Sequence, residues 1–447
     1  MTALRQAPPQ SRLCGYPELL RTRLRILLPG RSGRPEAALL LRNGHLLTLS
    51  SILTASLGAV FWLFATSWYS TRDVGLAYAV ISAATLLAGL GQLNLADVLI
   101  RFLPAAGPHA RRLVLRCYAA AVLASVLAGV LFLVLVPRLI PSLSYLRDWA
   151  PAAAFLAGTA GYALFVVQDG ALTGLRRPGW VLAENGLFAV VKTLLMVACG
   201  LLALSAGILL SWIGALAVSL AVTTAYLLGR ALPQHQRRRP ADPAPDGLLR
   251  YAAADYVGFL FRLAAYNLVP LLVLDYLGPE QNAYFSLSWV IAYTLFLAAY
   301  NMGSSLIVEA ARAPEKLAEH ARTVLRHSGL LIAAGAAVLI VLAPRLLSLF
   351  GPGYAAEGTT TVRLLALAAL PNLVLDVAVD VARARRRLGW AVGLQAALCA
   401  LVLGLGMTLM PHLGLTGIAL AWLLAETALA LPLLLTLPRW LPQRRPS

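Results

Sequence analysis

Arg262 lies in the middle of a strongly apolar stretch, VGFLFRLAAYNLVPLLVL at 257–274. A guanidinium cannot deprotonate to avoid an apolar medium, and an ionisable side chain inside a bilayer costs about 3 kcal/mol on insertion scales and far more in simulations. Such residues therefore face a bundle interior or a wet cavity. Because the planar guanidinium suits a phosphate, we interpret Arg262 as a cleft residue that binds an anion.

Polar residues on the same predicted helix extend this candidate site. Tyr266 and Asn267 follow Arg262 by about one turn, and we expect Pro270 to kink the helix and free a backbone carbonyl. Asp255 lies about two turns earlier on the same face. It allows an alternative, in which Arg262 forms a buried ion pair with Asp255 or another acid and locks helices together.

Lys192 is the second cation inside an apolar stretch and is a further candidate for the cleft. Glu184 precedes it on nearly the same helix face, with Asn185 next to Glu184. A structural Glu–Lys pair explains this spacing at least as well as a ligand site does.

Four acidic residues are candidate carboxylates for proton coupling: Asp255, Glu184, Asp376 and Asp380. Asp376 and Asp380 share a helix face near the predicted cytoplasmic end of a span. The alternative is that they are solvated or paired with arginines, since RARRR follows directly at 383–387.

Patterns typical of enzymes and metal sites are missing from the sequence. It contains no HExxH, GxSxG or Walker A pattern and no DxD-like glycosyltransferase pattern. The cysteines have no CxxC spacing; they are Cys14, Cys117, Cys199 and Cys399. We therefore predict a protein that is not an enzyme and that needs no metal, cofactor or disulfide framework.

The composition indicates the element that must position these side chains, which is the membrane-spanning helix. The 447 residues are 60% hydrophobic and only 13% charged, with a mean hydropathy of +0.76, whereas soluble proteins carry about 25% charged residues. We predict an all-α integral membrane protein with about twelve transmembrane helices. The expected spans are 46–68, 75–99, 113–136, 150–173, 181–203, 206–229, 251–275, 282–307, 328–350, 361–382, 389–409 and 414–437.

The distribution of the net charge of +18 predicts the topology. Most Lys and Arg residues fall in the N-terminal region, the even-numbered loops and the C-terminus. Those in the odd-numbered loops are few: Arg72, Arg138, Arg147, Arg345 and Arg363. By the positive-inside rule both termini are cytoplasmic. The charge therefore predicts topology and does not indicate a nucleic-acid partner.

The two halves of the chain resemble each other, and they divide it into domains. In one register Tyr69 pairs with Tyr276, Asp73 with Glu280, and Asn94 with Asn301. LRRPGW at 175–180 also resembles RRRLGW at 385–390. We expect two six-helix bundles related by a pseudo-two-fold axis along the membrane normal, as in alternating-access carriers. The predicted domains are a basic tail (1–41), a first bundle (42–231), a cytoplasmic linker (232–249), a second bundle (250–438) and a cytoplasmic tail (439–447).

Asn94 and Asn301 occupy equivalent places in this repeat, near the cytoplasmic ends of two spans. They are candidate cleft residues. Hydrogen bonding between helices is the somewhat better supported alternative.

The stretch from Ser67 to Pro104 resembles the start of bacterial polysaccharide flippases of the Wzx type, which share a superfamily with multidrug-and-toxin exporters. The resemblance rests on a short turn with Asp73 and Gly75, followed by a small-residue run that ends in Arg101 and Pro104. The two-bundle plan extends it over about residues 42–440.

The resemblance implies a multi-pass protein of the bacterial cell membrane that moves a polyprenyl-diphosphate-linked oligosaccharide from the inner to the outer leaflet. It also implies contacts with membrane lipids and with polysaccharide assembly proteins. Cations in the cleft would hold the diphosphate, and this chain offers only Arg262 and Lys192 for that role.

Three other functions are alternatives to the flippase. A drug/cation antiporter of the same fold would need acids deep in the first bundle; the first span has none, while Asp169 and Glu184 keep this alternative open. A glycan polymerase or ligase would need a large extracytoplasmic loop. A major-facilitator-type symporter would need a Gly–acid–basic signature between spans two and three, where RFLPAAGPHARR stands.

The predicted topology can be tested with single cysteines in a cysteine-free background. We expect His235→Cys to react with a membrane-impermeant thiol reagent only from the cytoplasmic side and Gly353→Cys only from the outside, because the charge rule puts these positions on opposite faces. The measurement is labelling in intact cells and in inverted vesicles. The reverse pattern of labelling would overturn the predicted orientation.

Overall fold

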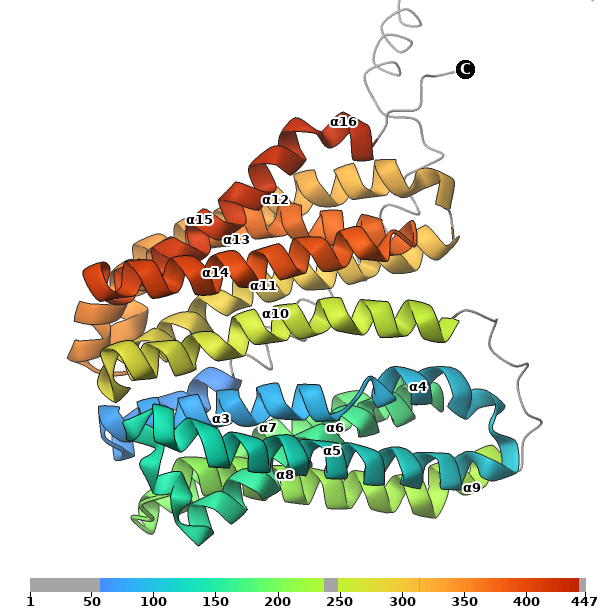
Figure 1. The fold of residues 1–447 in the computed structure, drawn as a ribbon, viewed down its shortest axis with the longest axis horizontal. Coiled ribbons are helices and arrows are strands. Elements are labelled where there is room, and N and C mark those ends of the chain that lie inside the picture. Colours follow the sequence, from blue (N-terminus) through green and yellow to red (C-terminus); the bar gives the residue numbers. More distant parts are fainter. Residues whose placement is uncertain (1–56, 237–247, 313, 442–447) are drawn as a thin grey trace, which may run out of the picture.

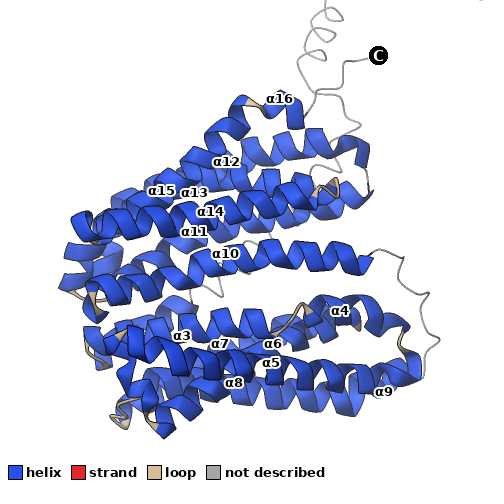
Figure 2. Cartoon of the chain, viewed as in Figure 1, coloured by secondary structure: helices blue, strands red, loops and turns tan. Residues whose placement is uncertain are grey.

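The computed structural model describes residues 57–236, 248–312 and 314–441, and every regular element in these ranges is a helix (Figure 2). Eleven of these helices are long and apolar enough to cross a membrane, and a shorter apolar helix, Leu57–Trp68, precedes them. The predicted all-α integral membrane fold is therefore confirmed. Only part of the first expected span, 46–68, lies within the described residues, and the predicted tail 1–41 lies outside them.

The first bundle contains helix Leu57–Trp68 and the helices from α3 to α9 (Figure 1). Helix α6 is its centre, because it packs against α3, α4, α5 and α8. A π-helical turn, Leu227–Ala231, joins α8 to α9. The helices are α3 (Thr71–Gly91), α4 (Leu95–Phe102), α5 (Ala110–Leu139), α6 (Trp149–Gly174), α7 (Pro178–Leu201), α8 (Gly207–Tyr226) and α9 (Leu232–Gln236).

The second bundle contains the helices from α10 to α16 and repeats this plan. Helix α13 is its centre and packs against α11, α12 and α15. The predicted domain boundaries stay a prediction; α9 lies within the expected linker, of which 237–247 is outside the described residues. The helices are α10 (Leu248–Leu277), α11 (Pro279–Arg312), α12 (Leu317–Ser348), α13 (Pro352–Ala384), α14 (Leu388–Leu413), α15 (Leu415–Leu435) and α16 (Leu437–Trp440).

One turn occurs in the same form in both bundles and shows the internal repeat at the level of the backbone. Arg176 and Arg386 both have φ of 57°, in the left-handed region. The next residue in each turn donates its N–H back to the helix, from Arg177 to Leu172 O at 2.9 Å and from Arg387 to Ala382 O at 2.8 Å. This is the bond of a Schellman helix end, where glycine is usual. A strained arginine in both turns is a shared feature that helix composition alone does not explain.

The expected span 75–99 is wrong as a single continuous helix. Helix α3 ends at Gly91, and Leu93 and Asn94 have φ of 49° and 59° before α4 begins. Helix α11 in the second bundle continues unbroken past the equivalent point. Asn94 and Asn301 therefore lie in different local structures. Asn94 is part of the break, whose left-handed conformation asparagine tolerates, whereas Asn301 is buried within α11.

The two bundles meet through α3, which packs against α10 and α11. The end of the molecule at which α3 and α11 begin is called the outer end, after the charge-based prediction; it lies at the left in Figure 1. The opposite end is called the inner end. At the outer end the buried Asn282 donates from Nδ2 to Gly75 O at 2.8 Å. A Cβ on Gly75 would lie 1.8 Å from Pro279 O, so only glycine permits this approach.

Gly75→Ala should weaken this contact, since the added methyl group would overlap a backbone oxygen that cannot rotate away. We expect a loss of about 1–3 kcal/mol of stability, seen as a lower midpoint of thermal unfolding in detergent. Gly186→Ala is the matched control, because no atom lies within 4 Å of a Cβ at that helical position. Equal midpoints for the two variants would contradict the assigned contact.

Candidate functional site

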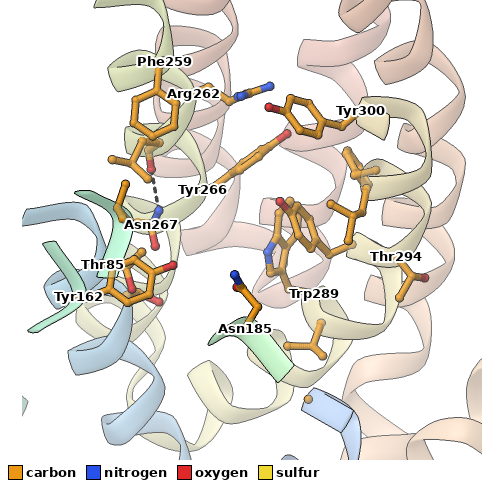
Figure 3. A pocket seen from close by; sticks show the side chains of 18 of the residues that line it. Thr85, Tyr162, Asn185, Phe259, Arg262, Tyr266, Asn267, Trp289, Thr294 and Tyr300 are labelled. Atoms are coloured by element: carbon orange, nitrogen blue, oxygen red, sulfur yellow. Dashed lines mark hydrogen bonds between the residues drawn. The ribbon is translucent and has the colours of Figure 1, made fainter. Parts of the chain in front are cut away.

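A cavity of about 910 Å³ lies between the two bundles, and Figure 3 shows many of the side chains that line it. Helices α3, α6 and α7 contribute Tyr78, Ser82, Thr85, Tyr162 and Asn185, and helix Leu57–Trp68 contributes Trp62. The second bundle contributes its residues from α10, α11 and α13: Phe259, Arg262, Tyr266, Asn267, Trp289, Tyr293, Tyr300 and Asp376, with several aliphatic residues between them.

One face of α10 supplies three of the residues predicted from the sequence. Arg262, Tyr266 and Asn267 line the cavity together because their spacing puts them on adjacent turns of one face. Asn267 donates to Leu263 O at 2.9 Å, so part of its amide is used within the helix. The Tyr266 ring stacks on Trp422, with a centroid separation of 5.4 Å.

Arg262 contacts an aromatic ring, and among the described residues it forms no ion pair with a carboxylate. Its Cζ lies 4.7 Å from the centroid of the Tyr300 ring (Figure 3). A desolvated cation–π contact contributes about 2 kcal/mol, less than the cost of about 3 kcal/mol or more for a charge in hydrocarbon. The ring alone therefore does not offset this cost, and the guanidinium also interacts electrostatically with Asp376 in the same cavity.

The alternative in which Asp255 forms a buried ion pair with Arg262 is wrong. Asp255 pairs with Arg383 instead, with 2.7 Å between Oδ1 and Nε, and Arg383 also lies 3.5 Å from Asp380 Oδ1. Asp376 is the acidic residue that lines the cavity, and it interacts electrostatically with Arg262. Within the described ranges no carboxylate lies within 4.0 Å of the Arg262 guanidinium.

Lys192 and Glu184 lie inside the first bundle and are not part of the cavity lining. The Lys192 ammonium lies 4.6 Å from the Phe61 ring centroid and 5.3 Å from that of Phe188. Glu184 is buried, and with the Gln168 amide turned to satisfy both of its neighbours, the amide nitrogen donates to Glu184 Oε1 at 2.8 Å. The suggested Glu184–Lys192 pair is not among the ion pairs of the described residues.

Asp380, Asp255, Asn94 and Asn301 are likewise outside the lining of this cavity. Asp380 and Asp255 both form ion pairs with Arg383. Of the candidate coupling carboxylates, Asp376 alone reaches the cavity within the part of the chain that the structure describes.

Sequence reasoning missed the aromatic character of the site. Trp289, Tyr293, Phe296 and Tyr300 form a stripe along α11 at alternating spacings of four and three residues, and all four line the cavity. This is the spacing of one helix face. The signal was present in the sequence, but aromatic stripes at this spacing are also typical of ordinary helix packing.

The cavity extends toward the inner end of the molecule. Thr173 and Tyr300 lie far along α6 and α11 from their starts at the outer end, and both belong to the lining. The outer ends of α3 and α11 are held together by the contact between Asn282 and Gly75. Nearer the inner end α3 is also joined to α10, because Tyr256 Oη donates to Gly89 O at 2.5 Å.

The fold is that of transporters of the MOP superfamily. An inward-facing MATE family multidrug resistance transporter superposes with a TM-score of 0.70 at 15% identity, over 91% of this chain and 98% of that one. The outward-facing conformation of such a transporter gives 0.62 at 14% identity, over 90% and 95% of the two chains.

A MOP superfamily transporter from Pyrococcus furiosus, described as having a binding pocket of reversed polarity, gives 0.63 at 14% identity, over 90% and 95% of the two chains. No family model matches the sequence, and no curated protein matches it. The resemblance is thus one of fold.

Arg383→Gln should destabilise the protein, because the change leaves Asp380 and Asp255 without their cation in a largely buried place. Breaking a buried pair from one side costs about 3–5 kcal/mol, and the measurement is the thermal unfolding midpoint in detergent. Adding Asp380→Asn and Asp255→Asn should recover much of the loss. Arg387→Gln, at an exposed position nearby, is the control; an equal loss in that variant would contradict the ion-pair explanation.

Proposed function

We propose that this protein is an alternating-access membrane transporter that carries an amphipathic organic molecule of low net charge, in the manner of a drug/cation antiporter. The observation that carries this proposal is the lining of the central cavity. It is rich in aromatic rings, and among the residues of the lining Arg262 and Asp376 are the charged ones.

The size and chemistry of the cavity fit such a substrate. A volume of about 910 Å³ is within the range of ligand pockets for drug-sized molecules, which are mostly apolar with a few polar groups. Trp and Tyr faces attract organic cations and stack on flat apolar groups. Arg262 and Asp376 offset each other, so the described lining has little net charge.

Asp376 is the proposed coupling carboxylate of this transporter. It lies in the lining, where it can exchange a proton or cation with solvent and sense a substrate charge. The fold supports alternating access, because structures of the same fold exist in inward-facing and outward-facing conformations.

A lipid-linked oligosaccharide flippase is the second candidate, and Arg262 favours it. The guanidinium lines the cavity, and its planar geometry suits a phosphate. The resemblance of residues 67–104 to Wzx-type flippases points the same way. Against it, a diphosphate site would need several cations, and Lys192 does not line the cavity.

The two candidates predict opposite effects of Arg262→Ala on ligand binding. We expect the purified protein in nanodiscs to bind a lipophilic cation such as tetraphenylphosphonium, and to bind it several-fold more tightly in Arg262→Ala because a repulsive charge is removed. Trp289→Ala should weaken that binding about tenfold through loss of a ring contact.

A polyprenyl diphosphate is titrated in parallel, with Arg326→Gln as an exposed control that changes the charge equally. Saturable diphosphate binding that falls in Arg262→Ala but not in the control, with no response to the cation, would replace the antiporter by the flippase.

A further inference from the structure

A second cavity, of about 520 Å³, lies at the inner end of the first bundle, between the end of α4 and the first two turns of α5. Phe102 and Leu113 provide apolar lining, and the cationic side chains of Arg112 and Arg116 together with His109 line it as well. No acidic residue is among those that line it. These elements lie at the right of Figure 1, where α4 leads into α5.

The charges around this cavity repel one another. Arg112 and Arg116 are one helical turn apart, a spacing at which like charges destabilise a helix. Arg111 and Arg112 also occupy the first turn of α5, where the helix dipole is positive and no acidic residue is present. An anion in the cavity would relieve both effects.

Protein groups do not supply that anion within the described residues. Arg112, Arg116 and His109 are exposed, and none of their side chains takes part in an ion pair there. The nearest acid along the chain, Asp97, interacts with Arg101 and Arg383 instead.

The internal repeat shows that the fold does not require these cations. The register that pairs Pro137 in α5 with Pro344 in α12 puts Glu319 at the place of Arg112 and Thr323 at the place of Arg116. The second copy of this helix start thus carries an acid and a neutral residue. The arginine pair at these two positions is therefore not repeated in the second bundle, whose helix start carries Arg322 and Arg326 at other positions.

The surface next to the cavity indicates where its ligand comes from. Leu115, Leu123, Leu127 and Leu131 are exposed along α5, and a spanning helix meets lipid chains with such a surface. A basic pocket at this depth, on the side with most of the positive charge, matches the sites that bind anionic lipid head groups.

We propose that this cavity binds the phosphate head group of an anionic phospholipid from the leaflet at the inner end, with its acyl chains along α5. Arg112 and Arg116 bind the phosphate, and His109 is the third polar side chain of the site. This inference does not depend on the transported substrate, because the cavity is separate from the central one.

The test measures binding of fluorescent phosphatidylglycerol to the full-length protein in phosphatidylcholine nanodiscs. We expect saturable binding that weakens about tenfold or more in the double variant Arg112→Gln/Arg116→Gln, because each arginine contributes to attraction of an anionic lipid. Arg112→Lys/Arg116→Lys should retain most of the affinity, since the charge remains.

The matched control is Arg326→Gln/Arg387→Gln, which removes the same charge from exposed positions in the second bundle. It should bind phosphatidylglycerol as the parent does. Wild-type affinity in the Arg112/Arg116 double glutamine variant, or an equal loss in the control, would overturn the proposal. Inorganic phosphate at millimolar concentration is the second probe; if it displaces the lipid completely, the site takes free phosphate and the lipid assignment is wrong.

Discussion

A membrane interior contains no water to solvate a charge, and the arrangement of this protein's ionisable side chains follows from that constraint. Each buried charged group needs a partner or a wet space. Arg383 has two carboxylates within ion-pair distance, Lys192 lies between two aromatic rings, and Glu184 accepts a hydrogen bond from Gln168. Arg262 has a ring contact that is too weak to offset its desolvation, and it is the one of these cations that lines the central cavity.

The two bundles share a backbone plan and differ in their charges. The register set by the strained turns at Arg176 and Arg386 pairs Val166 with Asp376 and Thr173 with Arg383. Val166, Thr173 and Asp376 all line the central cavity. The repeated fold therefore directs the equivalent residues Val166 and Asp376 toward the same space, where the first copy has an apolar side chain and the second an acid, while Arg383 does not line the cavity. Function in such a protein depends on where the two copies have diverged.

Features that depend on local composition could be predicted from the sequence, and contacts between distant helices could not. Hydropathy and the charge bias depend on local composition, so the helical membrane fold and most spans were predicted correctly. Arg262 and Asp376 were found because a charge within an apolar run is conspicuous. The partner of Asp255 was not predictable, since Arg383 lies on a helix far along the chain and on a face that the spacing does not reveal. Gly91 and Asn94 are local signals for the break between α3 and α4, but the long apolar stretch around them favoured one continuous span.

The contact at the outer end combines weak polar interactions with apolar packing. One hydrogen bond joins Asn282 to Gly75, with a net contribution of about 1 kcal/mol. The exposed pair of Arg72 and Glu280, 4.0 Å apart, adds about 0–1 kcal/mol. Apolar packing supplies the rest, because Phe61, Trp62 and Val74 of the first bundle lie in one buried cluster with residues of the second bundle, among them Ala283 and Leu347. Opening the outer end would separate this apolar cluster, so a substrate would shift the equilibrium only through a differential affinity that offsets its exposure. Apolar packing thus supplies most of the contact, while the hydrogen bond to Gly75 fixes the register in which α3 and α11 meet.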